Sequence, residues 1–300
     1  MKDHKMLDNG LLFSTEAIEL LEGDPKEKEL RLSLIQLAMG IELIVKDRLA
    51  NEHWSLVFET PQTAKPKKWE EADFKSVGYS EAIKRLESIT GQAFSRQEDF
   101  QRMIDQRNKL IHLGLAYSVE AMKASASKAI GALIEFINER LPEDERTEDQ
   151  TQSIESLVKS TTKFEHYVQG RLSEIEVELD GFTVLKCLAC SMPTLKVDCG
   201  IKCLFCSYET DDVAIAAESF SEVMEYRDIY QCPACEWNAM VYVEPEYTAT
   251  NDGIYLCFDC NRTWADGELD DCSMCSAPIE EVEGMSLCGE CIGYRLSKDD

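Results

Sequence analysis

The 300-residue sequence lacks any apolar run that approaches the roughly 20 residues needed to span a bilayer. Its first residues, MKDHKMLDNG, also lack the basic and then apolar pattern of a secretory signal peptide. We therefore expect a soluble cytoplasmic protein with no membrane segment. The hydrophobic fraction of 44% allows a sizeable core, and the length suits two or three domains.

Basic residues are scarce in the last third of the chain. Residues 201–300 contain 5 Lys and Arg against 22 Asp and Glu, whereas residues 1–150 contain 21 against 28. Nucleic-acid affinity depends first on cations that neutralise phosphates, so we expect any RNA contact in the first half. The acidic last third is expected to meet an unknown partner protein with a basic surface, unless its charge serves only solubility.

Cysteine is absent from the first 186 residues, and all 13 cysteines lie between positions 187 and 291. Twelve of them form six CxxC pairs, and the intervals inside successive couples of pairs are 12, 21 and 12 residues. In an intracellular protein this spacing favours metal over disulfides, because two such pairs supply four thiolates to one zinc. The sequence predicts three structural Zn²⁺ sites in three zinc ribbons, with the ligands Cys187, Cys190, Cys203, Cys206, then Cys232, Cys235, Cys257, Cys260, then Cys272, Cys275, Cys288, Cys291.

Alternatives to this scheme remain at the two C-terminal sites. A crossed arrangement would join pair 232/235 to 272/275 and pair 257/260 to 288/291, which gives a RING-like pair of sites. Iron is an alternative to zinc. Cys199 is left over, and we expect it to be a free thiol rather than a redox group. Closed four-thiolate sites are usually structural because catalytic zinc keeps one position open for water.

The first 145 residues alternate amphipathic helix patterns with helix stops, which predicts an all-α bundle of about five helices. We expect helices over 7–22, 26–50, 80–90, 95–114 and 118–140, and a loop over 59–77. A further helix from Thr147 to about Leu172 and a hairpin that starts near Ile175 come next. The predicted domains are a helical bundle, a connector and three zinc ribbons, over 1–145, 146–180, 181–210, 211–265 and 266–300.

One helix carries a charge where its apolar stripe predicts hydrocarbon. Arg107 falls inside the stripe formed by Phe100, Met103, Ile104, Leu110 and Ile111. An unpaired charge in a core costs several kcal/mol, so a carboxylate should face it. Glu42 lies within about 60° of the centre of the apolar stripe on the 26–50 helix. We predict that Glu42 faces Arg107.

Two polar residues follow Arg107 on the same helix. Asn108 and His112 are four residues apart and share a face, so the amide of Asn108 can orient the imidazole. Arg107 and His112 point about 140° apart on a straight helix. They converge only if the arginine wraps around, if the helix distorts, or if the site straddles a two-fold dimer axis.

The segment RNKLIH, from Arg107 to His112, resembles the R-x(4–6)-H signature of HEPN domains, and the all-helical context over residues 7–141 is similar too. The resemblance implies a metal-independent endoribonuclease in which the ribose 2′-hydroxyl attacks the adjacent phosphate and leaves a 2′,3′-cyclic phosphate. In that reaction His112 would act as general acid or base, and Arg107 would stabilise the charge on the phosphorus oxygens. Asn108 would hold the histidine tautomer, and Glu42 would position the arginine. The resemblance also implies a homodimer and a role in stress, toxicity or phage defence.

A short basic segment is the candidate for RNA contact. Lys65, Lys67 and Lys68 form the only basic cluster with an adjacent aromatic residue, Trp69. A solvated loop is the alternative interpretation of this segment.

Two other functions remain open at this point. The first is a non-catalytic HEPN-like dimeric scaffold or nucleotide-binding protein whose zinc ribbons dock protein partners. The second is a zinc-ribbon adaptor associated with transcription or translation. The acidic charge of the ribbons argues against direct nucleic-acid binding in that second case.

Overall fold

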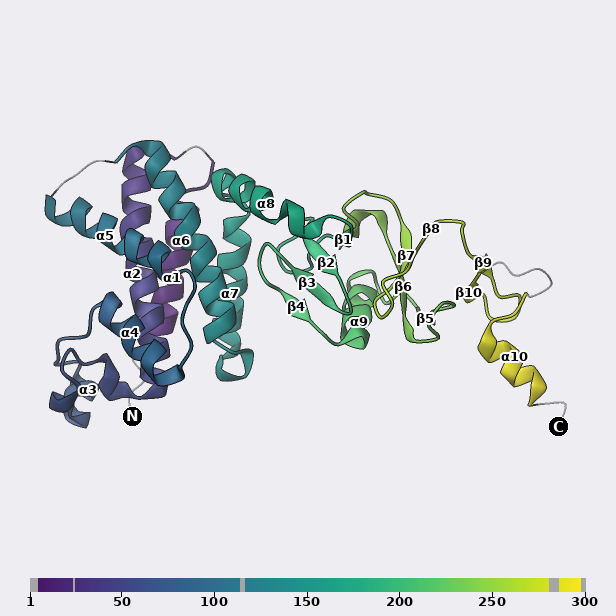
Figure 1. Ribbon diagram of the computed structural model, residues 1–300, viewed down its shortest axis with the longest axis horizontal. Helices are drawn as coiled ribbons and strands as arrows, with labels where there is room; N and C mark the ends of the chain where they lie inside the picture. Colours follow the sequence, from purple (N-terminus) through teal and green to yellow (C-terminus); the bar gives the residue numbers. More distant parts are fainter. Residues whose placement is uncertain (1–4, 24, 114–116, 281–285, 298–300) are drawn as a thin grey trace. The chain divides into compact units, whose positions relative to one another are not determined.

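The computed structural model describes residues 5–23, 25–113, 117–280 and 286–297. The chain forms two compact units, Met1–Glu174 and Ile175–Asp300. The first unit is helical, and the second consists of small antiparallel sheets that carry cysteine clusters (Figure 1). The predicted architecture of a helical bundle followed by β zinc-ribbon modules is therefore confirmed. Among the described residues, no helix has both the length and the apolar character that crossing a bilayer requires.

The N-terminal unit is built on an antiparallel pair of helices, α1 (Met6–Glu19) and α2 (Glu27–Glu52). Their backbones approach closely because glycines meet at the crossing: a Cβ on Gly40 would lie 2.7 Å from the carbonyl oxygen of Gly10. The absence of side chains at these two glycines lets the backbones of α1 and α2 pack closely. Helix α2 also contacts α4 (Tyr79–Thr90), α5 (Gln97–Leu113) and α6 (Val119–Arg140).

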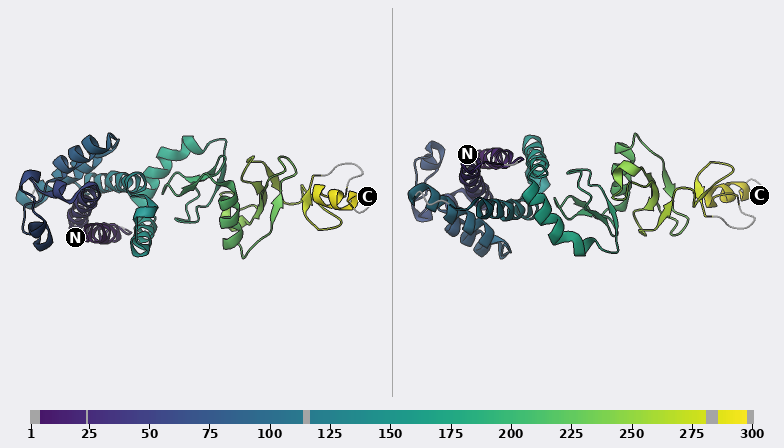
Figure 2. Two further views of the ribbon diagram at one scale, coloured as in Figure 1. Left: turned by 90° about the horizontal axis from the view of Figure 1, so that it is seen from below. Right: turned by 90° about the horizontal axis from the view of Figure 1, so that it is seen from above.

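The central position of α2 explains its composition. Apolar residues on several of its sides are fully buried, because other helices cover the helix from several directions. In Figure 2 helices α1, α2, α6 and α7 (Glu148–Thr161) are seen nearly end-on, so these four run along one common direction. The predicted helices in this region are confirmed, and Ser118 caps α6 by accepting a hydrogen bond from the Ala121 amide.

The segment predicted as a loop over 59–77 has more structure than expected. It contains part of a chain of short elements: η1 (Trp54–Val57), η2 (Pro61–Thr63) and α3 (Pro66–Glu71). Pro66 stands at the first position of α3, where a missing amide costs nothing and a fixed φ favours the helix. The two prolines that indicated a loop instead begin short helices.

The predicted connector is corrected in two respects. The expected single helix from Thr147 to Leu172 is two helices, α7 (Glu148–Thr161) and α8 (Glu165–Leu179). The capping box between Thr147 and Gln150 is present, but α7 packs against α1 as part of the bundle. Gln150 also donates a 2.9 Å hydrogen bond to Asp8. The first unit therefore extends beyond the predicted boundary at residue 145.

The predicted hairpin near Ile175 is wrong, since the chain stays helical to Leu179 and the first strand begins at Thr183. In the segment IEVEL, alternation of apolar and acidic residues suggested a strand. Ile175 is buried but Val177 is 83% exposed, so the alternation does not mark a buried face. Glutamate also has a high helix propensity and a low strand propensity.

The part of the C-terminal unit that the structure describes contains three small antiparallel sheets. The first has the order β1-β2-β3-β4, the second β5-β6-β7-β8, and the third is the pair β9-β10. The strands of the first sheet are Thr183–Leu185, Leu195–Val197, Ile201–Cys203 and Glu209–Thr210. Those of the second are Ile229–Gln231, Asn238–Val243, Ile254–Cys257 and Thr263–Ala265. Those of the third are Asp270–Asp271 and Pro278–Ile279.

The described residues of this unit also form three short helices. Helix α9 (Val213–Val223) packs against β6, and Asp212 caps it by accepting hydrogen bonds from two amides. The ring of Phe220 on α9 contacts that of Phe258 at 5.3 Å between centroids, and both are fully buried. The 3₁₀-helix η4 (Pro245–Tyr247) follows β6, and α10 (Gly289–Leu296) lies after the third sheet. Sheets this small bury too few side chains to be stable through their hydrophobic core alone, so they need additional stabilisation such as bound metal.

Candidate functional site

Three four-cysteine clusters are the most clearly built sites in the described residues. Each joins two successive CxxC pairs: 187/190 with 203/206, 232/235 with 257/260, and 272/275 with 288/291. In each cluster the four sulfur atoms lie within 4.8 Å of one another. The sequential arrangement is thus confirmed, and the crossed RING-like alternative is wrong.

The sulfur spacing fits tetrahedral zinc. Bonds of about 2.3 Å to one ion separate ligand sulfurs by about 3.8 Å. The measured separations include 3.6 Å for Cys187–Cys206, 3.8 Å for Cys232–Cys260 and 3.6 Å for Cys275–Cys288. The three clusters can therefore hold three zinc ions, and each offers a closed four-thiolate set of the structural type.

Five of the six CxxC pairs share one backbone turn that sequence inspection missed. The residue after the second cysteine has a left-handed backbone, and its amide donates to the carbonyl of the first cysteine at 2.8–2.9 Å. A non-glycine residue in this conformation costs about 1 kcal/mol or more, which a site-building turn can justify. The five residues are Ser191, Ser207, Glu236, Asn261 and Ser276. The sixth pair, 288/291, instead opens α10.

These turns aim backbone amides at the sulfurs. The amides of Cys206 and Ala234 point at Cys203 Sγ and Cys232 Sγ, at 3.5 and 3.4 Å. Such donors stabilise a thiolate, which is the form that binds metal. Within the first cluster, hydrogen bonds from Cys187 and the other thiols lower the pKa of Cys203. All four sulfurs of this cluster belong to buried residues, whereas the second and third clusters each include an exposed cysteine.

Cys199 lies outside the three clusters. Its side chain is exposed, and its backbone has a φ of 50°. Its amide donates to Asn261 Oδ1 at 3.4 Å. Its exposed thiol belongs to none of the three clusters, and the contact with Asn261 places it against the residue that follows Cys260 of the second cluster.

The predicted pairing of Arg107 with Glu42 is confirmed. Arg107 Nη2 lies 2.8 Å from Glu42 Oε2, with 20% and 22% of the two side chains exposed. The other carboxylate oxygen, Oε1, accepts from Lys46 Nζ at 2.7 Å. Lys46, which also donates to Ser76 Oγ at 3.0 Å, was missed at the sequence level. Its spacing of one helical turn from Glu42 is the signal that could have found it.

His112 and Asn108 lie apart from this ion pair. Both side chains are exposed, and His112 is in the last turn of α5. Helix α5 is continuous from Gln97 to Leu113, so no distortion brings Arg107 and His112 together. Within the described part of the chain, no hydrogen bond or ion pair joins His112 to Arg107 or to Asn108. The chain therefore positions the arginine but leaves the histidine separate from it.

The three lysines of the predicted RNA-contact segment and the adjacent tryptophan differ in their exposure to solvent. Lys65, Lys67 and Lys68 are exposed, and Lys67 lies 3.9 Å from Glu71. Trp69 is only 4% exposed, and its ring packs on Phe58 and Phe74. That ring is not available to stack on a base, which corrects the predicted role of Trp69 in RNA contact. It belongs to a small aromatic core beneath α3.

Comparisons with protein-family models, with curated proteins and with solved structures find no match for this chain. The likeness of residues 107–112 to the HEPN signature therefore depends on the motif and its helical context alone.

Proposed function

We propose that the helical unit is a metal-independent endoribonuclease that works as a homodimer, and that the acidic cysteine-rich unit recruits or restrains it. The observation that carries this proposal is the partly exposed guanidinium of Arg107, held by Glu42. Within the described residues, Glu42 engages only Nη2 of the three guanidinium nitrogens. Nε is buried without a partner among the described residues, so Nη1 is the donor that remains for an oxygen of a phosphate.

The proposed chemistry divides the proton transfers between histidines. His112 takes the proton of the ribose 2′-hydroxyl while the 2′-oxygen forms a bond to phosphorus. The bond from phosphorus to the 5′-oxygen breaks. The protonated imidazole of His112 in the second copy of the chain donates the proton that the leaving oxygen needs. Arg107 stabilises the charge that grows on the non-bridging oxygens. Asn108 orients the imidazole of His112 once the site is assembled.

A second copy of the chain would supply what one protomer lacks. Arg107 and His112 diverge on one continuous helix, so a two-fold axis near the end of α5 is needed to bring two motifs into one cleft. Ile111 and Leu113, which flank His112, are 50% and 68% exposed. Exposed apolar side chains beside the motif suit a contact between copies.

A non-catalytic scaffold is the competing function. The bridging of Arg107 and Lys46 by one carboxylate is also what a purely structural ion network looks like. In that case the chain would be a dimeric adaptor whose zinc modules dock protein partners. The two functions differ in what they require of His112, which the structural network does not use.

The test is cleavage of RNA by the purified full chain in EDTA, with zinc content and helicity measured in parallel. We expect products with 2′,3′-cyclic phosphate and 5′-hydroxyl ends, and we expect His112→Ala to abolish them. His53→Ala is the matched control, because His53 is another exposed histidine at a helix end. Equal cleavage by His112→Ala, or none by the intact protein, refutes the ribonuclease proposal.

RNA binding gives a second readout. Replacing Lys65, Lys67 and Lys68 by alanine together is expected to weaken binding and to reduce its salt dependence. Trp69 is left unchanged, because removing a buried ring would perturb the fold. Unchanged salt dependence would remove this segment from the proposed interface.

A further inference from the structure

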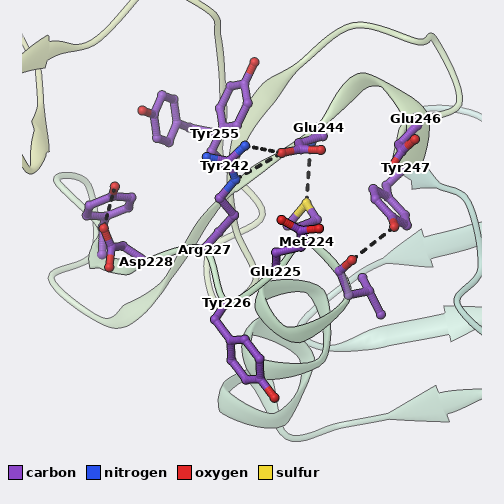
Figure 3. A pocket seen from close by; sticks show the side chains of 12 residues that line it. Met224, Glu225, Tyr226, Arg227, Asp228, Tyr242, Glu244, Glu246, Tyr247 and Tyr255 are labelled. Carbon is purple, nitrogen blue, oxygen red and sulfur yellow. Dashed lines mark hydrogen bonds and ion pairs between the residues drawn. The ribbon is translucent and has the colours of Figure 1, made fainter.

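A hollow of about 770 Å³ opens beside the second sheet, between the end of α9 and strands β6 and β7 (Figure 3). Its size is typical of ligand sites. Tyr242 and Tyr255 stand directly opposite each other on β6 and β7, with ring centroids 5.1 Å apart. Tyr230 on β5 extends the row, at 6.2 Å from Tyr255. We refer to the space lined by these rings as the tyrosine hollow.

The charged residues of the tyrosine hollow are mostly acidic. Four carboxylates and one guanidinium line it, which gives a net charge of −3. The cation is Arg227, and the acids are Glu225, Asp228, Glu244 and Glu246. Arg227 Nε donates to Glu244 Oε1 at 3.0 Å, and Nη2 donates to the same oxygen. Burial raises the pKa of Tyr242 further above its ordinary value of 10.0, and the phenol is neutral at physiological pH in either case.

Arg227, which lines the tyrosine hollow, indicates the kind of group that can bind there. Figure 3 shows its side chain reaching past Tyr242 to the carboxylate of Glu244. The arginine side chain is 55% exposed and the Glu244 side chain 27% exposed, so the cation is the partner of this ion pair that lies more in solvent. Aromatic faces and carboxylates together favour a guanidinium, which stacks and forms ion pairs at once.

We propose that the tyrosine hollow binds an arginine side chain from a basic segment of a partner protein, which displaces Arg227 from Glu244. The surroundings favour such a partner, since residues 201–300 contain only 5 Lys and Arg against 22 Asp and Glu. Each zinc with four thiolates adds about −2 to this charge. A nucleic acid would be repelled by the same surface. The inference concerns the cysteine-rich unit and does not depend on ribonuclease activity.

The experiment measures binding of a fluorescein-labelled GRGRGRGRG peptide to the zinc-loaded full chain in 150 mM salt, by anisotropy. A peptide with citrulline in place of arginine keeps the shape and removes the charge. Arg227→Ala is expected to tighten arginine-peptide binding by about three-fold, because the internal competitor, an exposed ion pair, is gone. Arg262→Ala is the matched control: it removes the same charge from a residue that is 56% exposed and pairs with Glu280 instead.

Loss of the acceptor gives the opposite result. Glu244→Gln is expected to weaken binding about five-fold, whereas Glu280→Gln, which removes an acid outside the hollow, leaves it nearly unchanged. Three zinc ions per chain in every variant would show that the modules are intact, and Arg227→Gln repeats the test with a smaller change. The proposal is overturned if Arg227→Ala and Arg262→Ala have equal effects, or if the citrulline peptide binds as tightly as the arginine peptide.

Discussion

Replacing Glu42 by glutamine tests the ion network on which the helical site depends. The substitution keeps the size of the side chain and removes the charge that bridges two cations. Arg107 and Lys46, whose side chains are 20% and 10% exposed, would then lie on either side of a neutral amide. Repulsion between them and their incomplete solvation both act against the folded state.

The exposures set the magnitude of this effect. Fully exposed ion pairs contribute about 0.2–1 kcal/mol, and breaking a fully buried pair costs about 3–5 kcal/mol. With 10–22% of each of the three side chains exposed, we expect Glu42→Gln to reduce the free energy of unfolding by about 2 kcal/mol. For a unit of this size that lowers Tm by about 4–8 °C. Arg107→Met should cost about 1 kcal/mol, because Glu42 then keeps Lys46 as its partner.

The assay is thermal unfolding of the full chain, followed by circular dichroism at 222 nm, where the helical unit dominates. Glu27→Gln is the matched control, since it removes an acid from the same helix whose ion pair with Arg31 is 54% and 42% exposed. We expect that control to change stability by less than about 0.5 kcal/mol. If Glu42→Gln costs no more than Glu27→Gln, or less than Arg107→Met, the bridging role assigned to Glu42 is wrong.

Three further predictions concern metal, packing and pH. Cys235→Ser should lower the zinc content from three ions to two per chain, whereas Cys199→Ser should leave it at three, as measured by elemental analysis. Gly40→Ala should destabilise the helical unit by about 2–3 kcal/mol in urea melts, because its Cβ would lie 2.7 Å from a backbone oxygen of α1. Gly170→Ala meets nothing within 4 Å and should stabilise α8 by up to about 1 kcal/mol, so equal effects would contradict this packing. Burial raises the pKa of Tyr79 above its usual 10.0, so the folded state holds the phenolic proton more tightly than the unfolded state does. Stability from this group is full below pH 10 and falls above it, and Tyr79→Phe should reduce that alkaline loss in urea melts between pH 8 and 11.

The zinc modules and the helical site were predicted from different kinds of information. Glu42 and Arg107 could be paired from the sequence because each breaks an apolar stripe, and two misplaced charges on neighbouring helices need one another. Lys46 follows Glu42 by one turn and looked like an ordinary surface lysine. It is nearly buried, and its Nζ donates to Ser76 Oγ, on the segment that follows α3.

Trp69 illustrates the opposite error. A tryptophan beside lysines suggested an RNA-stacking residue, and the prolines around it suggested a loop. The ring lies at 6.0 Å from Trp54 and 5.5 Å from Phe74, which are 15 positions before it and 5 after it. Whether an aromatic side chain faces solvent or its own neighbours is decided by these contacts, which a local pattern does not encode.

The sequence by itself determined that this chain has three four-thiolate sets that can hold metal, because four thiolates at CxxC spacing have one dominant chemical use. It also determined the helical character of the first half through apolar periodicity. Only the tertiary structure decided that neighbouring pairs join in order, since the crossed arrangement satisfies the same spacing. The tyrosine hollow is likewise a product of strand pairing: its rings are 12 to 25 residues apart in the chain and meet only because β5, β6 and β7 lie side by side.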